Sequence, residues 1–365
     1  MEDPIRVLCV FGTLDCGGAE TMCMNLYRKI DRNKVQFDFV KHSEKKGVYE
    51  DEIISLAGRI FEAPDLKKVG LFHYKKWWLN HLIAHPEHMI IHGHFFTVSK
   101  IYFSVAKSLG RITVGHCHSV NFRHGLKESA RRLFYKGTEK YCDFCLACSE
   151  QSGKFFFPNR DVKIIKNGIE TEKYKFNIET AGAVREEFGL NGDFVVGVVG
   201  SITEVKNPFE TIRIFKEVLK REPEAKLLWL GTGTLKEQLE EKIREEHLEG
   251  KVILAGIRLD VYRVLQAMDC YIMPSLMEGL PVALIEAQAE SLPCFCSDII
   301  TKEADVTGLC EYLPLKNEEL WAERILAGKG KERKDMTEKI EVAGYDVSKN
   351  ARCFEHFYLE ECLGK

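Results

Sequence analysis

The chain has 365 residues, of which 45% are hydrophobic and 29% charged, and this is enough apolar material for two domains with separate cores. The composition excludes disordered, collagen-like and coiled-coil proteins. The longest apolar runs, such as residues 194–200, are too short to span a membrane, and the N-terminal residues lack the apolar core of a signal peptide. We therefore expect a soluble, cytoplasmic protein.

The cysteines are numerous, thirteen in all, but without an export signal a disulfide framework is not expected, and most should be reduced core residues. Cys142 and Cys145 have the spacing of a zinc knuckle, yet no second pair of ligands follows at the required distance. Their apolar neighbours favour a buried strand, which also includes Cys148.

Charge divides the chain unevenly: the first 170 residues carry a net charge of +7 and the remainder −10. Ten of the twelve histidines lie between His42 and His124, and a basic half suggests an anionic partner. The positive excess peaks in residues 121–141, a predicted helix with an apolar side. This composition is typical of a helix that rests on an anionic membrane, although a solvated helix face is the alternative. Residues 75–78, Lys-Lys-Trp-Trp, are a second candidate contact or ordinary packing.

Strand and helix patterns alternate from the N-terminus onward. Residues 5–11 are a compact apolar strand, a glycine-containing turn follows, and residues 19–30 have helical spacing. Ser149 and Glu150 indicate the cap of another helix. Further strands are predicted at 35–40, 88–94, 112–118 and 143–149. This alternation predicts a mostly parallel sheet.

The pattern restarts after residues 173–184. Residues 194–200 form a new strand, and residues 208–220 a helix with Asn207 as N-cap and Pro208 in its first position. The later strands are predicted at 226–231, 252–256, 270–274 and 293–298, and the later helices at 235–247, 261–268, 282–291 and 348–362. The charged residues 328–335 are expected to form a loop or a helix end. The sequence thus predicts an α/β protein with two doubly wound domains in tandem.

Ligands of such sheets bind at the carboxyl ends of the strands, so the loops after them are the places to search. The first loop, residues 12–20, contains neither the dinucleotide-binding glycine pattern nor a P-loop ending. Its glycines would let the backbone approach a ligand closely.

The loop and helix start at residues 274–288 carry the most information. Glu278 precedes a Gly-Leu-Pro turn, and Glu286 lies inside the following helix. Free amides around Gly279, Leu280 and Val282, with the positive end of the helix dipole, suit a diphosphate. The two carboxylates suit hydroxyl groups such as those of sugars. A nucleotide diphosphate sugar meets both demands.

This segment, EGLPVALIE, resembles the E-x7-E motif of family-4 retaining glycosyltransferases. Ordered matches to the same family are GGAE at 17–20, KNGIETEKY at 166–174, GTGTL at 231–235, VILAG at 252–256 and SD at 297–298. The resemblance implies the GT-B fold, two Rossmann-like domains that face a cleft. It implies an acceptor domain at residues 1–172, a nucleotide-sugar domain at 173–345, and a C-terminal helix at 346–365 that packs back on the first domain, with hinges at 173–184 and 344–349.

The resemblance also implies an activity: transfer of a sugar, with retention, from a nucleotide-sugar donor, usually a UDP-sugar. The acceptor would be a saccharide or a lipid-linked saccharide in cell-surface polysaccharide synthesis. No metal or other cofactor is expected, and no nucleic acid. The protein would be cytoplasmic, with a peripheral contact to the inner face of an anionic membrane.

Carried over position by position, the resemblance assigns roles in the second domain. Glu286 would hold the ribose hydroxyls, and Glu278 would contact the donor sugar. Lys206 would neutralise the leaving diphosphate. The backbone contacts to diphosphate would come from Gly279, Leu280 and Val282, and the loop beside the base would be Gly256, Ile257 and Arg258.

In the first domain, His118 matches a histidine near the reacting sugar, and Gly17 and Gly18 would face the same cleft. Taken from its strand alone, His118 could equally be a core residue. Whether His116 or His118 points into the cleft is left to strand parity, and His92 and His94 raise the same question.

One departure from the family pattern is Ser201, where an arginine is common, so Lys206 would be the remaining cation of the usual pair. Two alternatives stay open, and Ser201 motivates the second. One is a nucleotide-sugar epimerase of related architecture. The other is a non-catalytic protein that binds a nucleotide sugar or a partner transferase.

Overall fold

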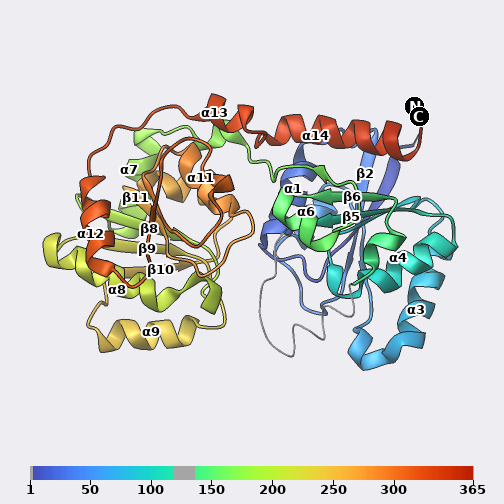
Figure 1. The fold of residues 1–365 in the computed structure, drawn as a ribbon, viewed down its shortest axis with the longest axis horizontal. Coiled ribbons are helices and arrows are strands. Elements are labelled where there is room, and N and C mark those ends of the chain that lie inside the picture. The colour runs from blue at the N-terminus through green and yellow to red at the C-terminus, as the bar shows by residue number, and fades with distance from the viewer. Residues whose placement is uncertain (1–2, 119–135, 365) are drawn as a thin grey trace. The chain divides into compact units, whose positions relative to one another are not determined.

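The computed structural model describes residues 3–118 and 136–364, which form two compact units (Figure 1). The first comprises residues 1–169 and 346–365, and the second residues 170–345. Each has its own parallel sheet, which confirms the predicted fold class of two Rossmann-like domains. Most of the predicted basic helix at 121–141 lies outside the described residues.

The first unit contains a seven-stranded parallel sheet of order β3-β2-β1-β4-β5-β6-β7. The predicted strands are confirmed, and the short strands β3 and β7 are additional. The bounds are β1 Ile5–Val10, β2 Val35–Lys41, β3 Ile60–Glu62, β4 Ile90–Gly93, β5 Ile112–Cys117, β6 Phe144–Ala147 and β7 Lys163–Ile164. Cys142, Cys145 and Cys148 are buried in and beside β6, as expected.

Helices cover both faces of this sheet, and two apolar clusters fill the space beneath them. The helices are α1 Gly18–Lys29, α2 Glu50–Ser55, α3 Leu66–Ala84, α4 Ser99–Ser108 and α6 Glu150–Phe156, with 3-10 turns η1 Phe96–Val98 and η2 Thr138–Tyr141. Ser149 caps α6 by accepting a hydrogen bond from the Ser152 amide, as predicted.

The end of the chain returns to the first unit. Helix α14 (Val347–His356) and the π turn η7 (Phe357–Cys362) pack beside α1, where Phe354, Phe357 and Tyr358 join the core cluster (Figure 1). This is the C-terminal helix that the family resemblance implied.

The second unit contains a six-stranded parallel sheet of order β10-β9-β8-β11-β12-β13. Its strands are β8 Val195–Val199, β9 Lys226–Leu230, β10 Val252–Gly256, β11 Cys270–Met273, β12 Cys294–Ser297 and β13 Cys310–Leu313. The last strand, which contains charged Glu311, was not predicted.

The helices of the second unit are α7 Ile178–Phe188, α8 Pro208–Arg221, α9 Lys236–Glu245, α10 Val261–Val264, α11 Val282–Ala289, α12 Glu318–Ala327 and α13 Thr337–Val342, with 3-10 turns η3 Thr171–Tyr174, η4 Glu204–Lys206, η5 Leu265–Ala267 and η6 Lys302–Ala304. The predicted helices of this unit are present, whereas α7, α12 and α13 were not predicted. The predicted hinge segment 173–184 is largely helical in α7, because Asn177 caps that helix and left-handed Gly189 ends it. The units divide between residues 169 and 170, where the sequence predicted 172 and 173.

Asn207 also differs from its predicted role. It stands at the N-cap position of α8, but its side chain makes no capping hydrogen bond. Its left-handed backbone, with φ of 54°, turns the amide toward the loop after β11, where Nδ2 donates to the Pro274 carbonyl at 3.1 Å. The residue ties two loops together.

Among the described residues, none of the helices has the length and apolar content to cross a bilayer.

Candidate active site

Two loops at the carboxyl ends of β8 and β11 bring Lys206 and Glu278 together. The Leu276 amide donates to the Val205 carbonyl at 2.8 Å, and Asn207 holds Pro274. Lys206 Nζ then donates to Glu278 Oε1 at 2.6 Å, with the side chains 19% and 11% exposed. The cation and the carboxylate expected at the donor site are thus an ion pair, still reachable from solvent.

Helix α11 begins directly after this pair, and its start is rich in free donors. Its N-cap residue, Pro281, provides no capping side chain. Within the described chain, the amides of Gly279, Leu280 and Val282 donate no hydrogen bond. Free amides at a helix start, together with the helix dipole, favour an anion such as a phosphate.

Glu286 lies one turn into α11 and is buried. The Tyr174 hydroxyl donates to its Oε1 at 2.5 Å. Burial raises the pKa of Glu286, and the hydrogen bond from Tyr174 opposes that rise. A partly desolvated carboxylate with one oxygen held in place can accept hydrogen bonds from ligand hydroxyls.

Glycines let the ends of β8, β9 and β10 approach closely. The Gly231 amide donates to the Gly256 carbonyl at 2.7 Å. A Cβ on Gly231, whose φ is 138°, would lie 2.1 Å from the Gly200 carbonyl oxygen, so only glycine fits there.

The residues after Gly256 differ in their surroundings. Ile257 is 48% exposed. The Arg258 guanidinium pairs with Asp260 at 2.7 Å and with Glu187 at 3.0 Å, so it stiffens this loop. Ser201 is exposed and its Oγ lies 3.3 Å from Thr203 Oγ1.

In the first unit, His118 follows the end of β5. Its Nε2 shares a hydrogen bond of 2.8 Å with His94 Nδ1, and its Nδ1 lies 3.4 Å from Asn167 Oδ1. His116 and His118 are two positions apart and share a face, with ring centroids 4.0 Å apart. The expectation that strand parity would separate them was wrong, because residues two positions apart face the same side. Burial separates them instead: His116 is fully buried, whereas His118 is partly exposed.

Burial keeps this imidazole neutral, since desolvation lowers the pKa of His118 to about 4. A neutral histidine can accept a proton or donate one through a fixed nitrogen.

Gly17 and Gly18 stand at the start of α1. Gly17 is the N-cap residue, and a Cβ there would lie 2.2 Å from Glu20 Oε2. Burial raises the pKa of Glu20 to about 7. The first loop therefore presents a glycine backbone and the carboxyl group of Glu20, which gains or loses its proton close to neutral pH.

Comparison with known proteins decides the family. Residues 16–173 match the family Glycosyltransferase Family 4, and residues 183–341 match Glycosyl transferases group 1. EpsF, a protein of Bacillus subtilis named as a glycosyltransferase, is 32% identical over 97% of this chain and 96% of its own length. The chain belongs to the glycosyltransferases.

Two further likenesses extend this finding. This chain is 27% identical to a UDP-Gal:alpha-D-GlcNAc-diphosphoundecaprenol alpha-1,3-galactosyltransferase of Escherichia coli. The match covers 60% of this chain and 60% of the relative. The crystal structure of HepE from Anabaena, in complex with UDP and glucose, shares its fold with a TM-score of 0.76 at 16% identity, over 99% of this chain and 100% of that one. Such solved neighbours confirm the GT-B fold.

The glycosyltransferase also contains site residues that the sequence analysis did not single out. Tyr174 donates a hydrogen bond to Glu286, Asn167 contacts His118, and Glu20 lies beside Gly17. All three lie within the segments that resemble the family, which was the available signal. His94, whose orientation the sequence left open, contacts His118 because β4 pairs with β5.

Proposed function

We propose that this glycosyltransferase transfers a sugar from a UDP-sugar, with retention at the anomeric carbon, to a saccharide or lipid-linked acceptor in cell-surface polysaccharide synthesis. The observation that carries the proposal is the junction of Lys206, Glu278 and the free amides of α11 at the strand ends of the second unit. A diphosphate needs a cation and amide donors, and a sugar needs a carboxylate.

The relatives support the donor and acceptor classes. The Escherichia coli relative is named for a UDP-galactose donor and a diphosphoundecaprenol-linked acceptor. A Bacillus subtilis relative is named for teichuronic acid biosynthesis. The fold neighbour HepE is described with UDP and with glucose.

Lys206 can contact the diphosphate of the sugar donor and the carboxylate of Glu278 at the same time. Its ammonium group has three N–H donors, and Glu278 occupies one. A second N–H would bind an oxygen of the leaving diphosphate, a charge-assisted contact of about 1.5–3 kcal/mol. The contact strengthens as negative charge develops on that oxygen, and it therefore lowers the barrier.

Transfer would proceed by front-face displacement. The bond between the anomeric carbon and the diphosphate oxygen breaks, while the acceptor oxygen bonds to the same face of that carbon. The proton of the acceptor hydroxyl passes to the leaving phosphate oxygen, and the leaving group departs as UDP. No residue acts as a covalent nucleophile, and the proposal requires no metal.

The protein would reach its acceptor by docking on the inner face of an anionic membrane, with helix α3 as the docking surface. This helix has a kink at Gly70, and it contains four lysines but no Asp or Glu. Phe72, Leu79 and Ile83 follow one another at helical spacing, 73%, 38% and 60% exposed. Exposed Lys75 and Lys76 flank them. An apolar stripe beside lysines matches an anionic lipid surface.

The donor class is tested by a thermal-shift and calorimetric screen with UDP, GDP, ADP and their sugar conjugates. Binding to the folded state raises the melting temperature. We expect UDP compounds to raise the melting temperature of the wild type but not of Glu286→Ala. The control is Glu237→Ala, which removes an exposed glutamate of α9 and should keep the stabilisation. Stabilisation by GDP or ADP compounds alone, or by none, would refute the UDP assignment.

The same preparation distinguishes the alternatives. An epimerase would convert the donor without any acceptor. A non-catalytic relative, suggested by Ser201, would bind UDP-sugar but release no UDP when acceptor is added.

A further inference from the structure

Two neighbouring strands of the first unit each end in a His-x-His pair. His92 lies in β4 and His94 directly after it, and His116 lies in β5 and His118 directly after it. The parallel register pairs His92 with Val114 and Gly93 with Gly115, so the four imidazoles gather at one edge of the sheet. The His92 and His94 ring centroids are 4.2 Å apart, and the His92 and His116 rings stack at 5.3 Å.

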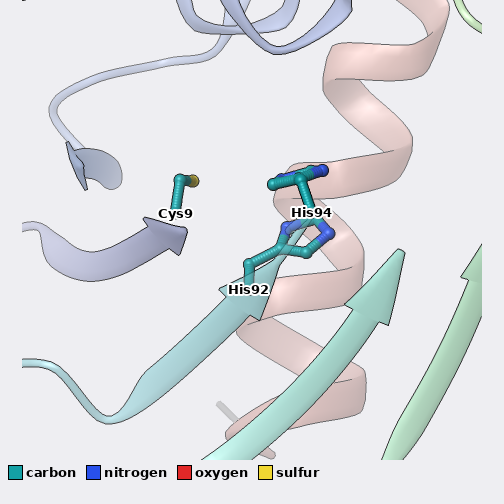
Figure 2. A group of neighbouring side chains, drawn as sticks. All are labelled: Cys9, His92 and His94. Carbon is teal, nitrogen blue, oxygen red and sulfur yellow. The ribbon is translucent and has the colours of Figure 1, made fainter. Parts of the chain in front are cut away.

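Strand β1 adds a thiol to this cluster. Cys9 is paired directly with His92 in the sheet, and Figure 2 shows its sulfur turned toward the two imidazoles of β4. Cys9 Sγ and one nitrogen each of His92 and His94 lie within 4.8 Å of one another. Cys9 and His92 are buried, whereas His94 is partly exposed, which gives a small ion a way in.

Each of these two histidines has one nitrogen held and one without a partner. His92 Nδ1 shares a hydrogen bond of 2.6 Å with the Tyr358 hydroxyl, and His94 Nδ1 one of 2.8 Å with His118. Nε2 of both residues is buried and has no hydrogen-bond partner among the described residues. An unpaired buried nitrogen is costly, and an imidazole oriented through its other nitrogen is the usual arrangement of a metal ligand.

We propose that Cys9, His92 and His94 bind a divalent transition-metal ion, with Zn²⁺ favoured over Mg²⁺ and Ca²⁺. A thiolate and two imidazoles suit zinc, whereas magnesium and calcium prefer oxygen ligands. The transfer reaction uses none of these three side chains as a reactant, so the site is additional to the proposed function. Metal ligation through Nε2 would leave the proton of His94 on Nδ1, directed at His118.

The wild-type chain decides the proposal without any variant. After removal of metals with a chelator, the protein is loaded with one equivalent of Zn²⁺ and examined by X-ray absorption. We expect one sulfur ligand at about 2.3 Å and at least two nitrogen ligands at about 2.0 Å. Nitrogen and oxygen ligands alone, or several sulfurs, would overturn the assignment to Cys9, His92 and His94.

Variants then locate the ion through the Co²⁺ spectrum. The thiolate-to-cobalt band should disappear in Cys9→Ser, and Zn²⁺ affinity should fall at least tenfold in Cys9→Ser and His92→Asn. Cys117→Ser is the matched control, because Cys117 is equally buried in the same sheet but belongs to the core on its other face. A band that persists in Cys9→Ser, or binding lost in His116→Asn while Cys9→Ser retains it, would contradict the proposal.

Discussion

At the scale of single residues, the proposed donor site contains a buried carboxylate, Glu286, that one hydroxyl keeps in place. Tyr174 donates to Glu286 at 2.5 Å, and both side chains are buried. Without the hydroxyl, Glu286 loses a hydrogen bond and its desolvation goes uncompensated. In the proposed function, this hydrogen bond between η3 and α11 would serve both folding and donor binding.

Tyr174→Phe tests this link. We expect it to lower the free energy of unfolding by about 1–3 kcal/mol and to weaken UDP binding, because the freed carboxylate is protonated or turns away. Chemical denaturation and calorimetry measure the two effects. Tyr262→Phe is the control, since its ring packs near Tyr174 with centroids 6.3 Å apart. Equal effects of both substitutions would argue against a specific role for the Tyr174 hydroxyl.

Glu290 is a second buried carboxyl group, and it governs stability as the pH changes. Burial raises the pKa of Glu290 to about 8, with Arg333 opposing the rise from 3.7 Å. The folded chain thus holds a proton that the unfolded chain loses at lower pH. Stability contributed by this group is present below the unfolded pKa and is lost as the pH rises toward 8.

Glu290→Gln should remove this dependence. Between pH 5 and pH 8 we expect the wild type to lose on the order of 3 kcal/mol relative to the variant, measured by denaturation at each pH. A parallel pH profile for both proteins would show that Glu290 is ionised in the folded state throughout.

At the scale of elements, short segments position the chemistry. The donor phosphate would meet the first turn of α11, a helix of eight residues, while Lys206 comes from the 3-10 turn η4. Hydrogen bonds from Leu276 and Asn207 fix these two pieces against each other. The site thus relies on loop register more than on long helices.

Helix α3 carries the membrane prediction. Phe72→Ser combined with Ile83→Ser removes the ends of its apolar stripe, so binding to anionic vesicles at low salt should fall by about tenfold or more. Cosedimentation measures it. Val342→Ser, at an apolar α13 residue that is 81% exposed, is the matched control and should bind normally. Vesicle binding that survives the double substitution would exclude α3 as the docking surface.

At the scale of the whole molecule, periodicity predicted most of the architecture but not its irregular parts. The apolar strands and the helix after Asn207 were predictable because their burial follows from local patterns. Strands β3, β7 and β13 were missed because they are short or polar, and α7 because its sequence resembles a link. Helices α12 and α13 were missed as well. The cluster of Cys9 with His92 and His94 was not predictable, since it depends on β1 lying between β2 and β4.

Of the candidate site, the presence of Lys206 and Glu278 in one place could be predicted, because both follow strand ends of one parallel sheet. Their direct ion pair did not follow, since it rests on hydrogen bonds between two loops. Arg258 shows the same limit: its sequence neighbours gave no sign that Glu187, far away in the chain, would engage it.

Acceptor-dependent, retaining transfer from a UDP-sugar is the activity that we propose for this glycosyltransferase. The most direct measurement is UDP release from a UDP-sugar with and without a polyprenyl-diphosphate-linked saccharide, with the product's anomeric configuration read by NMR. We predict release that requires the acceptor and a product with the donor's configuration. Lys206→Ala should slow it about 10- to 100-fold, and Lys236→Ala should not. Release independent of acceptor, an inverted product, or an unaffected Lys206→Ala protein would contradict the account.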